Sequence, residues 1–135
     1  MRRLAAVAAA LLAALPACAA TVEPPPGERL DAAALHALYS SGFHAEGDGP
    51  RLGAVVFDLL PDGRMLIDGP LGEWRWRLDG DSFCIERSML GIARDYCMIV
   101  YRTADGRYDA YFAMRHPGEA AAQPGRRNLS FTLRP

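Results

Sequence analysis

Residues 71–102 read LGEWRWRLDGDSFCIERSMLGIARDYCMIVYR, and this stretch decides the fold. It holds both tryptophans, two of the three cysteines and the most hydrophobic segment outside the N-terminus. Trp74, Trp76 and Leu78 alternate with polar residues, a period of two that is typical of a strand with one buried and one solvated face. The stretch therefore predicts paired antiparallel strands with the two indole rings in a core.

The turn in this stretch leaves the strand register open. Asp-Gly sequences favour tight hairpin turns because glycine adopts positive φ without steric cost. A two-residue turn at Asp79-Gly80 pairs Trp76 with Phe83 on one core face, whereas a three-residue loop at 79–81 pairs Trp76 with Cys84. A slip of one residue would exchange the buried and exposed faces, so the two registers predict different core residues.

Two cysteines lie at positions that an antiparallel hairpin would place opposite each other. Cys84 and Cys97 are equidistant from a tip at Leu90-Gly91. Cross-strand Cβ atoms lie roughly 4.5 Å apart, close to the roughly 3.8 Å of a disulfide. We therefore predict a Cys84–Cys97 disulfide, which would stabilise the fold by about 3 kcal/mol in the chain-entropy model.

The first 20 residues have the composition of a secretory signal peptide. A basic start, Met1-Arg2-Arg3, precedes a run of Ala, Val and Leu over residues 4–15 and a small-residue exit over residues 16–20. The apolar run is shorter than the roughly 20 residues of a transmembrane helix. We therefore predict export to the periplasm, where disulfides form, with no transmembrane anchor.

Two ways of processing this segment are compatible with the sequence. Ala17-Cys18-Ala19 fits the small-x-small pattern of ordinary cleavage, which we favour and which releases a soluble protein. Residues 15–18 also resemble a bacterial lipobox, in which Cys18 would be lipidated and would hold the protein on a membrane.

The remaining chain, about 115 residues, is the size of one domain with a modest core. Residues 21–29 contain three consecutive prolines and form a predicted extended tether, and residues 30–135 form the predicted domain. Asp31 is a candidate N-cap for a short helix from Ala32 to about Ser40, because its carboxylate can accept from free backbone N–H groups.

From Phe43 onward the pattern is one of strands separated by Gly, Pro and Asp turns. The expected elements are a short edge strand at 43–46, a loop at 47–50, strands at 52–60 and 65–67, the strand of Trp74, Trp76 and Leu78, a returning strand through Phe83 and Ile85, strands at 96–102 and 107–114, a loop at 115–127 and a strand at 129–133. The predicted fold is mainly β: an antiparallel meander of about eight strands in a small calycin-like barrel, with one short N-terminal helix.

The sequence offers few groups for catalysis or metal binding. Its three histidines, His36, His44 and His116, have no cysteine or carboxylate at ligand spacing, and no serine lies in a nucleophile pattern. The chain carries 15 arginines, no lysine and 16 acidic residues, for a formal net charge of −1, and lacks the basic patch of nucleic-acid-binding proteins. We therefore expect no catalytic residues, no metal, no cofactor and no nucleic-acid partner.

Binding is the more plausible activity, because an eight-stranded barrel is wide enough to hold one small ligand. Rings at a barrel mouth with arginines at its rim would orient a small acidic or amphipathic ligand. The candidate ligand or partner contacts are Arg75, Arg77, Arg107, Trp74, Trp76 and Tyr101.

Several segments also carry a family resemblance. LDAAALHALYSSG, G-EWRWRLDGDSFC, C-IVYR and DGRY, which span roughly residues 30–112, resemble small exported proteins of gram-negative bacteria classed as domains of unknown function. The resemblance implies a fold and no catalytic residues. The chain is more loosely similar to periplasmic lysozyme inhibitors, which are disulfide-bearing β-barrels. Their inhibitory loop motif is not evident in this sequence.

Three hypotheses for function follow from these observations. The first is a non-enzymatic envelope protein that binds a small ligand or an envelope protein. The second is an inhibitor of a cell-wall-degrading enzyme such as lysozyme, and the third is an envelope hydrolase.

Overall fold

The computed structural model describes residues 23–68, 73–89, 92–115 and 117–135. The predicted signal peptide, including Cys18, and the predicted hairpin tip at Leu90-Gly91 lie outside the described residues.

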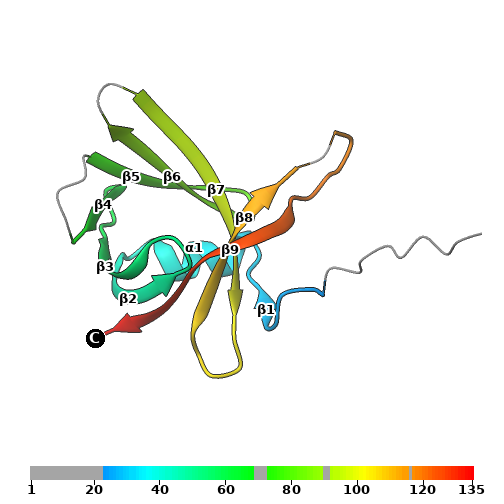
Figure 1. The fold of residues 1–135 in the computed structure, drawn as a ribbon, viewed down its shortest axis with the longest axis horizontal. Coiled ribbons are helices and arrows are strands. Elements are labelled where there is room, and N and C mark those ends of the chain that lie inside the picture. The colour runs from blue at the N-terminus through cyan, green and yellow to red at the C-terminus, as the bar shows by residue number, and fades with distance from the viewer. Residues whose placement is uncertain (1–22, 69–72, 90–91, 116) are drawn as a thin grey trace, which may run out of the picture.

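The described chain forms a closed antiparallel barrel of eight strands, as the alternation and turn spacing predicted (Figure 1). Consecutive strands β2 to β9 are neighbours, and the barrel closes where β9 pairs with β2. Two residues of the predicted tether form a further short strand, β1, beside β7. The elements are β1 Glu28–Arg29, α1 Ala32–Tyr39, β2 Phe43–Gly49, β3 Gly53–Leu59, β4 Arg64–Ile67, β5 Glu73–Asp79, β6 Ser82–Met89, β7 Ile92–Arg102, β8 Tyr108–Met114 and β9 Gln123–Arg134.

The expected edge strand at 43–46 and loop at 47–50 are wrong. β2 continues to Gly49 and pairs along its length with β3 and over five residues with β9. A Cβ atom at Gly47 or Gly49 would collide with the backbone of β9, at the carbonyl oxygens of Ser130 and Asn128. The glycines that suggested a loop instead permit the close approach of two strands.

The β5–β6 hairpin has neither of the two predicted registers. Trp76 pairs with Ile85 and Asp79 with Ser82, so the two turn residues are 80 and 81 rather than 79 and 80. Gly80, with φ of 58°, takes the first central position of the turn. Relative to the two-residue prediction the strands are displaced by two positions, which preserves the predicted core face.

The predicted disulfide is present between directly opposed residues. Cys84 pairs with Cys97 in the β6–β7 ladder, and their sulfur atoms are 1.96 Å apart. Cys84 is completely buried although its side chain lies on the face of β6 opposite Phe83 and Ile85, which enter the barrel core. The bridge therefore stabilises the β6–β7 hairpin from outside the barrel.

The expected loop at 115–127 is too long, because β9 begins at Gln123 rather than near 129. Residues 123–127 pair with the end of β8 through two register shifts, which bend the hairpin. Pro124 and Gly125 suggested a loop, but a proline is tolerated at an irregular strand end and Gly125 gives room for Met114.

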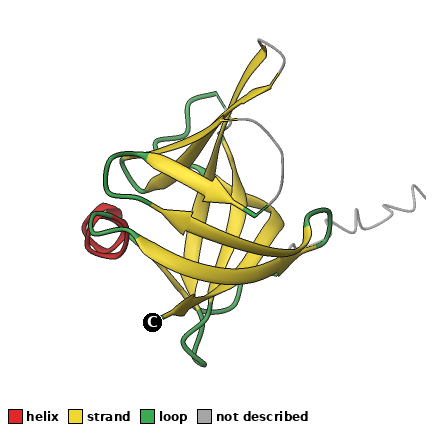
Figure 2. Cartoon of the chain, turned by 90° about the vertical axis from the view of Figure 1, so that its left-hand side faces the viewer, coloured by secondary structure: helices red, strands yellow, loops and turns green. Residues whose placement is uncertain are grey.

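Helix α1 lies across one end of the barrel (Figure 2). Its N-cap is Asp31, as predicted, and the Asp31 side chain accepts a 2.8 Å hydrogen bond from the backbone N–H of Ala34. Leu35 and Tyr39 point into the barrel and are buried. The Tyr39 ring stacks on Phe83, with centroids 4.5 Å apart, and so closes this end of the barrel with aromatic packing.

Candidate functional site

A cavity of about 200 Å³ remains inside the barrel, between α1 and the opposite end. Its walls come from seven of the eight barrel strands and are mainly apolar, and Tyr39 of α1 contributes to its lining. The apolar lining residues are Leu52, Ala54, Val55, Phe57, Met65, Ile67, Trp74, Phe83, Ile85, Met98, Ala110, Leu129 and Phe131.

The space exists because short and long side chains alternate around the inner wall. Ala110 of β8 lies between Val100 and Leu129 in the sheet and faces the cavity with a single methyl group. An eight-stranded barrel has just enough interior for its own side chains, so small residues at inner positions leave a void.

The polar lining residues gather at the end of the barrel away from α1. Because α1 leads into the start of β2, the other end holds the end of β4 and the turn after β2. Asp68 directly follows β4, and Asn128 lies beside Gly49 at the end of β2. The Asn128 side-chain amide lies 3.3 Å from the sulfur of Met98. The cavity therefore has an apolar interior and one polar end.

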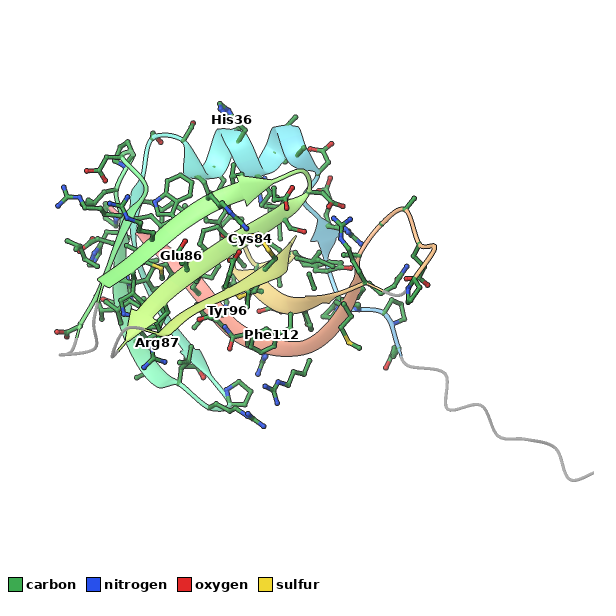
Figure 3. The ribbon with its side chains drawn as sticks, turned by 90° about the horizontal axis from the view of Figure 1, so that it is seen from above. His36, Cys84, Glu86, Arg87, Tyr96 and Phe112 are labelled. Carbon is green, nitrogen blue, oxygen red and sulfur yellow. A yellow bond between two sulfur atoms is a disulfide. The ribbon has the colours of Figure 1, made fainter. Side chains whose placement is uncertain are left out.

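Arg87 brings a positive charge to the polar end of the cavity. It is the register partner of Trp74 on the inner face of the β5–β6 hairpin, and its guanidinium lies 5.0 Å from the centre of the Trp74 ring. Arg87 is half-buried and lies on the same side of the molecule as Tyr96 (Figure 3). Stacking on an indole holds the planar guanidinium in place beside the cavity.

Tyr96 and Tyr39 line the same cavity and keep their phenol protons at neutral pH. Burial raises the pKa of Tyr96, and the nearby Arg87 charge opposes part of that rise. Burial also raises the pKa of Tyr39, with a smaller contribution from Tyr108. A neutral Tyr96 hydroxyl beside the Arg87 guanidinium provides a second donor for an anionic group.

Of the six predicted contact residues, Trp74 alone is among the described residues that line the cavity. Trp76 also points inward but lies near α1, where its indole N–H donates to the Leu60 carbonyl at 2.9 Å. Tyr101 is buried in a separate cluster with Ile99 and Ala122.

The three predicted arginines lie on the outside of the barrel. Arg75 and Arg77 are exposed on β5, and Arg77 forms a 2.6 Å ion pair with Asp95. Arg107 is exposed beside the β7–β8 turn, where its backbone N–H donates to the Thr103 hydroxyl at 3.1 Å. These positions remain candidates for partner contacts, but the structure does not bring them to the cavity.

Arg87 is the cavity residue that the sequence interpretation missed, although the sequence contains a signal for it. Phe83, Ile85 and Arg87 share one phase of the β6 alternation, so a charged residue follows two core residues on the core face. A charge in a core phase is rare unless it is paired or functional. The candidate contacts selected from the sequence did not include Arg87.

One buried polar cluster lies outside the cavity. Ser130 donates a 2.5 Å hydrogen bond to Asp109, and Arg127 donates to the Ser130 hydroxyl at 3.1 Å. Asp109 and Ser130 are buried, and together with Arg127 they join β8 to β9. The Ser130 hydroxyl donates to the Asp109 carboxylate and accepts from the Arg127 guanidinium, so these groups are engaged with one another.

Within the described ranges, no group of three or more His, Cys, Asp or Glu side chains is placed to hold a metal ion. In the same ranges, no helix has the length and hydrophobicity to cross a bilayer. Comparisons with protein-family models, curated proteins and solved structures found no match to this chain.

Proposed function

We propose that this protein is an exported, non-enzymatic envelope protein that binds one small, mainly apolar ligand with an anionic group inside its barrel. The observation that carries the proposal is the apolar cavity that ends at Arg87, stacked on Trp74. The signal-peptide pattern of residues 1–20 and the Cys84–Cys97 bridge support export to the periplasm.

The cavity volume limits the size of this ligand. An engineered cavity of about 150 Å³ in another protein binds benzene, so about 200 Å³ accommodates an apolar ring or short chain of about eight non-hydrogen atoms. The apolar part of the ligand would lie against Phe57, Met65 and Phe131. Its charged end would then meet the polar end of the cavity.

The charge at that end favours an anion over a neutral or cationic ligand. A guanidinium presents several N–H donors in one plane, which suits carboxylate and phosphate groups. The Tyr96 hydroxyl adds a neutral donor. Asp68 also lines the cavity and is exposed. Because its carboxylate is negatively charged, a cationic ligand is the competing prediction.

Titration with three ligands of one chain length tests the proposal. Octanoate, octanol and octylamine differ in the charge of the head group, and Trp74 fluorescence or calorimetry reports binding in the cavity. We expect octanoate to bind with one-to-one stoichiometry and at least tenfold more tightly than octanol, and octylamine to bind most weakly. Equal affinity for all three, or no binding, would contradict the proposal. Inhibition of lysozyme without octanoate binding would instead favour the wall-enzyme inhibitor.

A further inference from the structure

The strands β7 and β8 pair over only part of their length. Their ladder runs from Arg102 and Tyr108 to Met98 and Phe112. Beyond Met98, residues 92–97 of β7 pair with β6, and no described strand pairs with their other edge. Figure 1 shows the β6–β7 and β8–β9 hairpins diverging from this point. The barrel wall therefore has a split between two strand edges.

The backbone groups of alternate β7 residues point into this split. The Val100 carbonyl accepts a hydrogen bond from the backbone N–H of Leu30. Leu30 follows β1, and β1 lies along the same edge of β7 as β6 does. Since backbone groups of successive strand residues point to opposite edges, those of Asp95 and Cys97 point toward β8. The 3.9 Å Cα distance between Cys84 and Cys97 agrees, because it fits a pair without mutual backbone hydrogen bonds.

The opposing edge of β8 faces the same space. Tyr111 pairs with Ile99, one of the β7 residues whose backbone groups face β8. By the same alternation, the backbone groups of Ala113 and Arg115 also face β7. A hollow of about 400 Å³ lies here, and residues of both strands line it, including Asp95, Tyr96, Cys97, Phe112, Ala113 and Arg115.

Aromatic side chains border the split on the barrel side. The rings of Tyr96 and Phe112 contact each other with centroids 5.8 Å apart (Figure 3). The Arg126 guanidinium lies 5.0 Å from the centre of the Phe112 ring. On the outer face, polar residues of the same hollow lie beside Cys97 and Ala113, namely Asp79, Ser82, Asp95 and Arg115. A strand in the split would thus have apolar contacts on the barrel side and polar contacts on the outer side.

We infer that the split between β7 and β8 binds an extended segment of another protein by β-strand addition. An exposed edge is a template for a further strand, and main-chain hydrogen bonds then supply much of the affinity. The segment would pair with both strands where their edges have diverged to two strand spacings, about 9.6 Å, and with β7 alone beyond the end of β8. Its side chains would alternate, with every second one apolar and directed at Tyr96 and Phe112.

A single segment fits this site better than a second copy of the barrel. Two edges face one hollow, and one inserted strand satisfies both of them, whereas a second barrel offers one edge and leaves the other unpaired. The site is also distinct from the ligand cavity, although Tyr96 borders both.

Selection from a displayed library of randomised octapeptides on the oxidised protein tests this inference. We expect the selected peptides to share apolar residues at alternate positions, and their binding to slow amide exchange of Asp95 and Cys97. A library that yields no binder, or binders without alternation, would overturn the inference. Concentration-dependent dimerisation that protects the same amides would identify a second copy as the occupant and would also overturn it.

Two pairs of variants locate binding of a selected peptide at the split. Asp95→Pro removes a backbone N–H that faces the split and does not hydrogen-bond to β6, whereas Asp95→Ala keeps this N–H. Both variants lose the ion pair with Arg77, so the N–H is the difference between them. We expect at least tenfold weaker peptide binding by the proline variant than by the alanine variant at equal melting temperature.

Arg115→Pro and Arg115→Ala test the β8 edge in the same way, outside the strand itself. Should both proline variants bind the peptide as well as their alanine controls, the site is elsewhere and the inference fails. Arg87→Met should leave peptide binding unchanged, so this test and the octanoate test can fail independently.

Discussion

The two ends of the barrel use the same eight strands but are filled differently. At the α1 end, Tyr39 contacts the rings of Phe43, Trp76 and Phe83, all with centroids within 6.0 Å of its own. At the other end the lining leaves a cavity, and Arg87 replaces an apolar side chain on the core face. The contrast places the close aromatic packing at one end and the space for the proposed ligand at the other.

The largest expected effect is the loss of the ring that closes the α1 end. Tyr39→Ala should lower the free energy of unfolding by about 3–5 kcal/mol, the usual cost of truncating a buried aromatic side chain. Urea denaturation measures the change. His36→Ala is the matched control, because His36 is exposed on the same helix and its loss should cost less than about 0.5 kcal/mol. Similar costs for both would show that α1 is not the packed end.

The β6–β7 hairpin, which runs from the α1 end to the cavity end, should depend on the disulfide as well as on aromatic packing. The bridge crosses the β6–β7 hairpin, which supplies Arg87 and Tyr96 to the cavity. The double variant Cys84→Ala and Cys97→Ala should lose about 3 kcal/mol of unfolding free energy in the chain-entropy model. Reductant should destabilise the native protein by a similar amount and leave the double variant unchanged. A native protein whose melting temperature is insensitive to reduction would contradict this expectation.

Arg87 provides the sharpest test of the polar end. Arg87→Met retains much of the stem that packs on Trp74 but removes the charge. A hydrogen bond to a charged group contributes about 1.5–3 kcal/mol, so octanoate affinity should fall about 10- to 100-fold while octanol affinity stays the same. Arg77→Met, on the outer face of the barrel, is the control and should change neither. Equal losses for the acid and the alcohol would mean that Arg87 acts through packing.

The alternation of apolar and polar residues was sufficient to predict the barrel, and the positions of the two cysteines were sufficient to predict the disulfide. The period of Trp74, Trp76 and Leu78 identified the inner face correctly even though the hairpin register was displaced, because a shift by two residues preserves the face. Cys84 and Cys97 were predicted as opposed residues because they are equidistant from the predicted hairpin tip at Leu90-Gly91. The alternation of residues along a strand predicts its inner face where one face of the strand is buried and the other is exposed to solvent.

The sequence interpretation failed where long-range contacts override local preference. Gly47 and Gly49 indicated a loop, but their backbone lies against β9, which is far away in sequence. The start of β9 at Gln123 was missed because Pro124 and Gly125 have low strand propensity, and pairing with β8 decides their conformation. The cavity itself depends on which inner side chains meet across the barrel, and a single strand pattern does not contain that information.

The smallest expected effect is the change in stability when an inner alanine is enlarged, and it should have opposite signs at the two ends of the barrel. Ala110→Val adds two methyl groups beside the cavity, and filling a cavity commonly stabilises a protein by about 0.5–2 kcal/mol. Octanoate affinity should fall at the same time, because the added atoms occupy ligand space. Melting temperature and calorimetric titration of one variant therefore give opposite outcomes for stability and binding.

Ala45→Val is the control for this substitution in the filled part of the barrel. Ala45 is completely buried between Phe57 and Leu133 on neighbouring strands, and it is not among the cavity-lining residues. The same two methyl groups have no space there, so overpacking should destabilise the protein by about 1–3 kcal/mol. If both alanines responded with the same sign, the two ends would be equally packed, and the cavity would not be the space that receives the ligand.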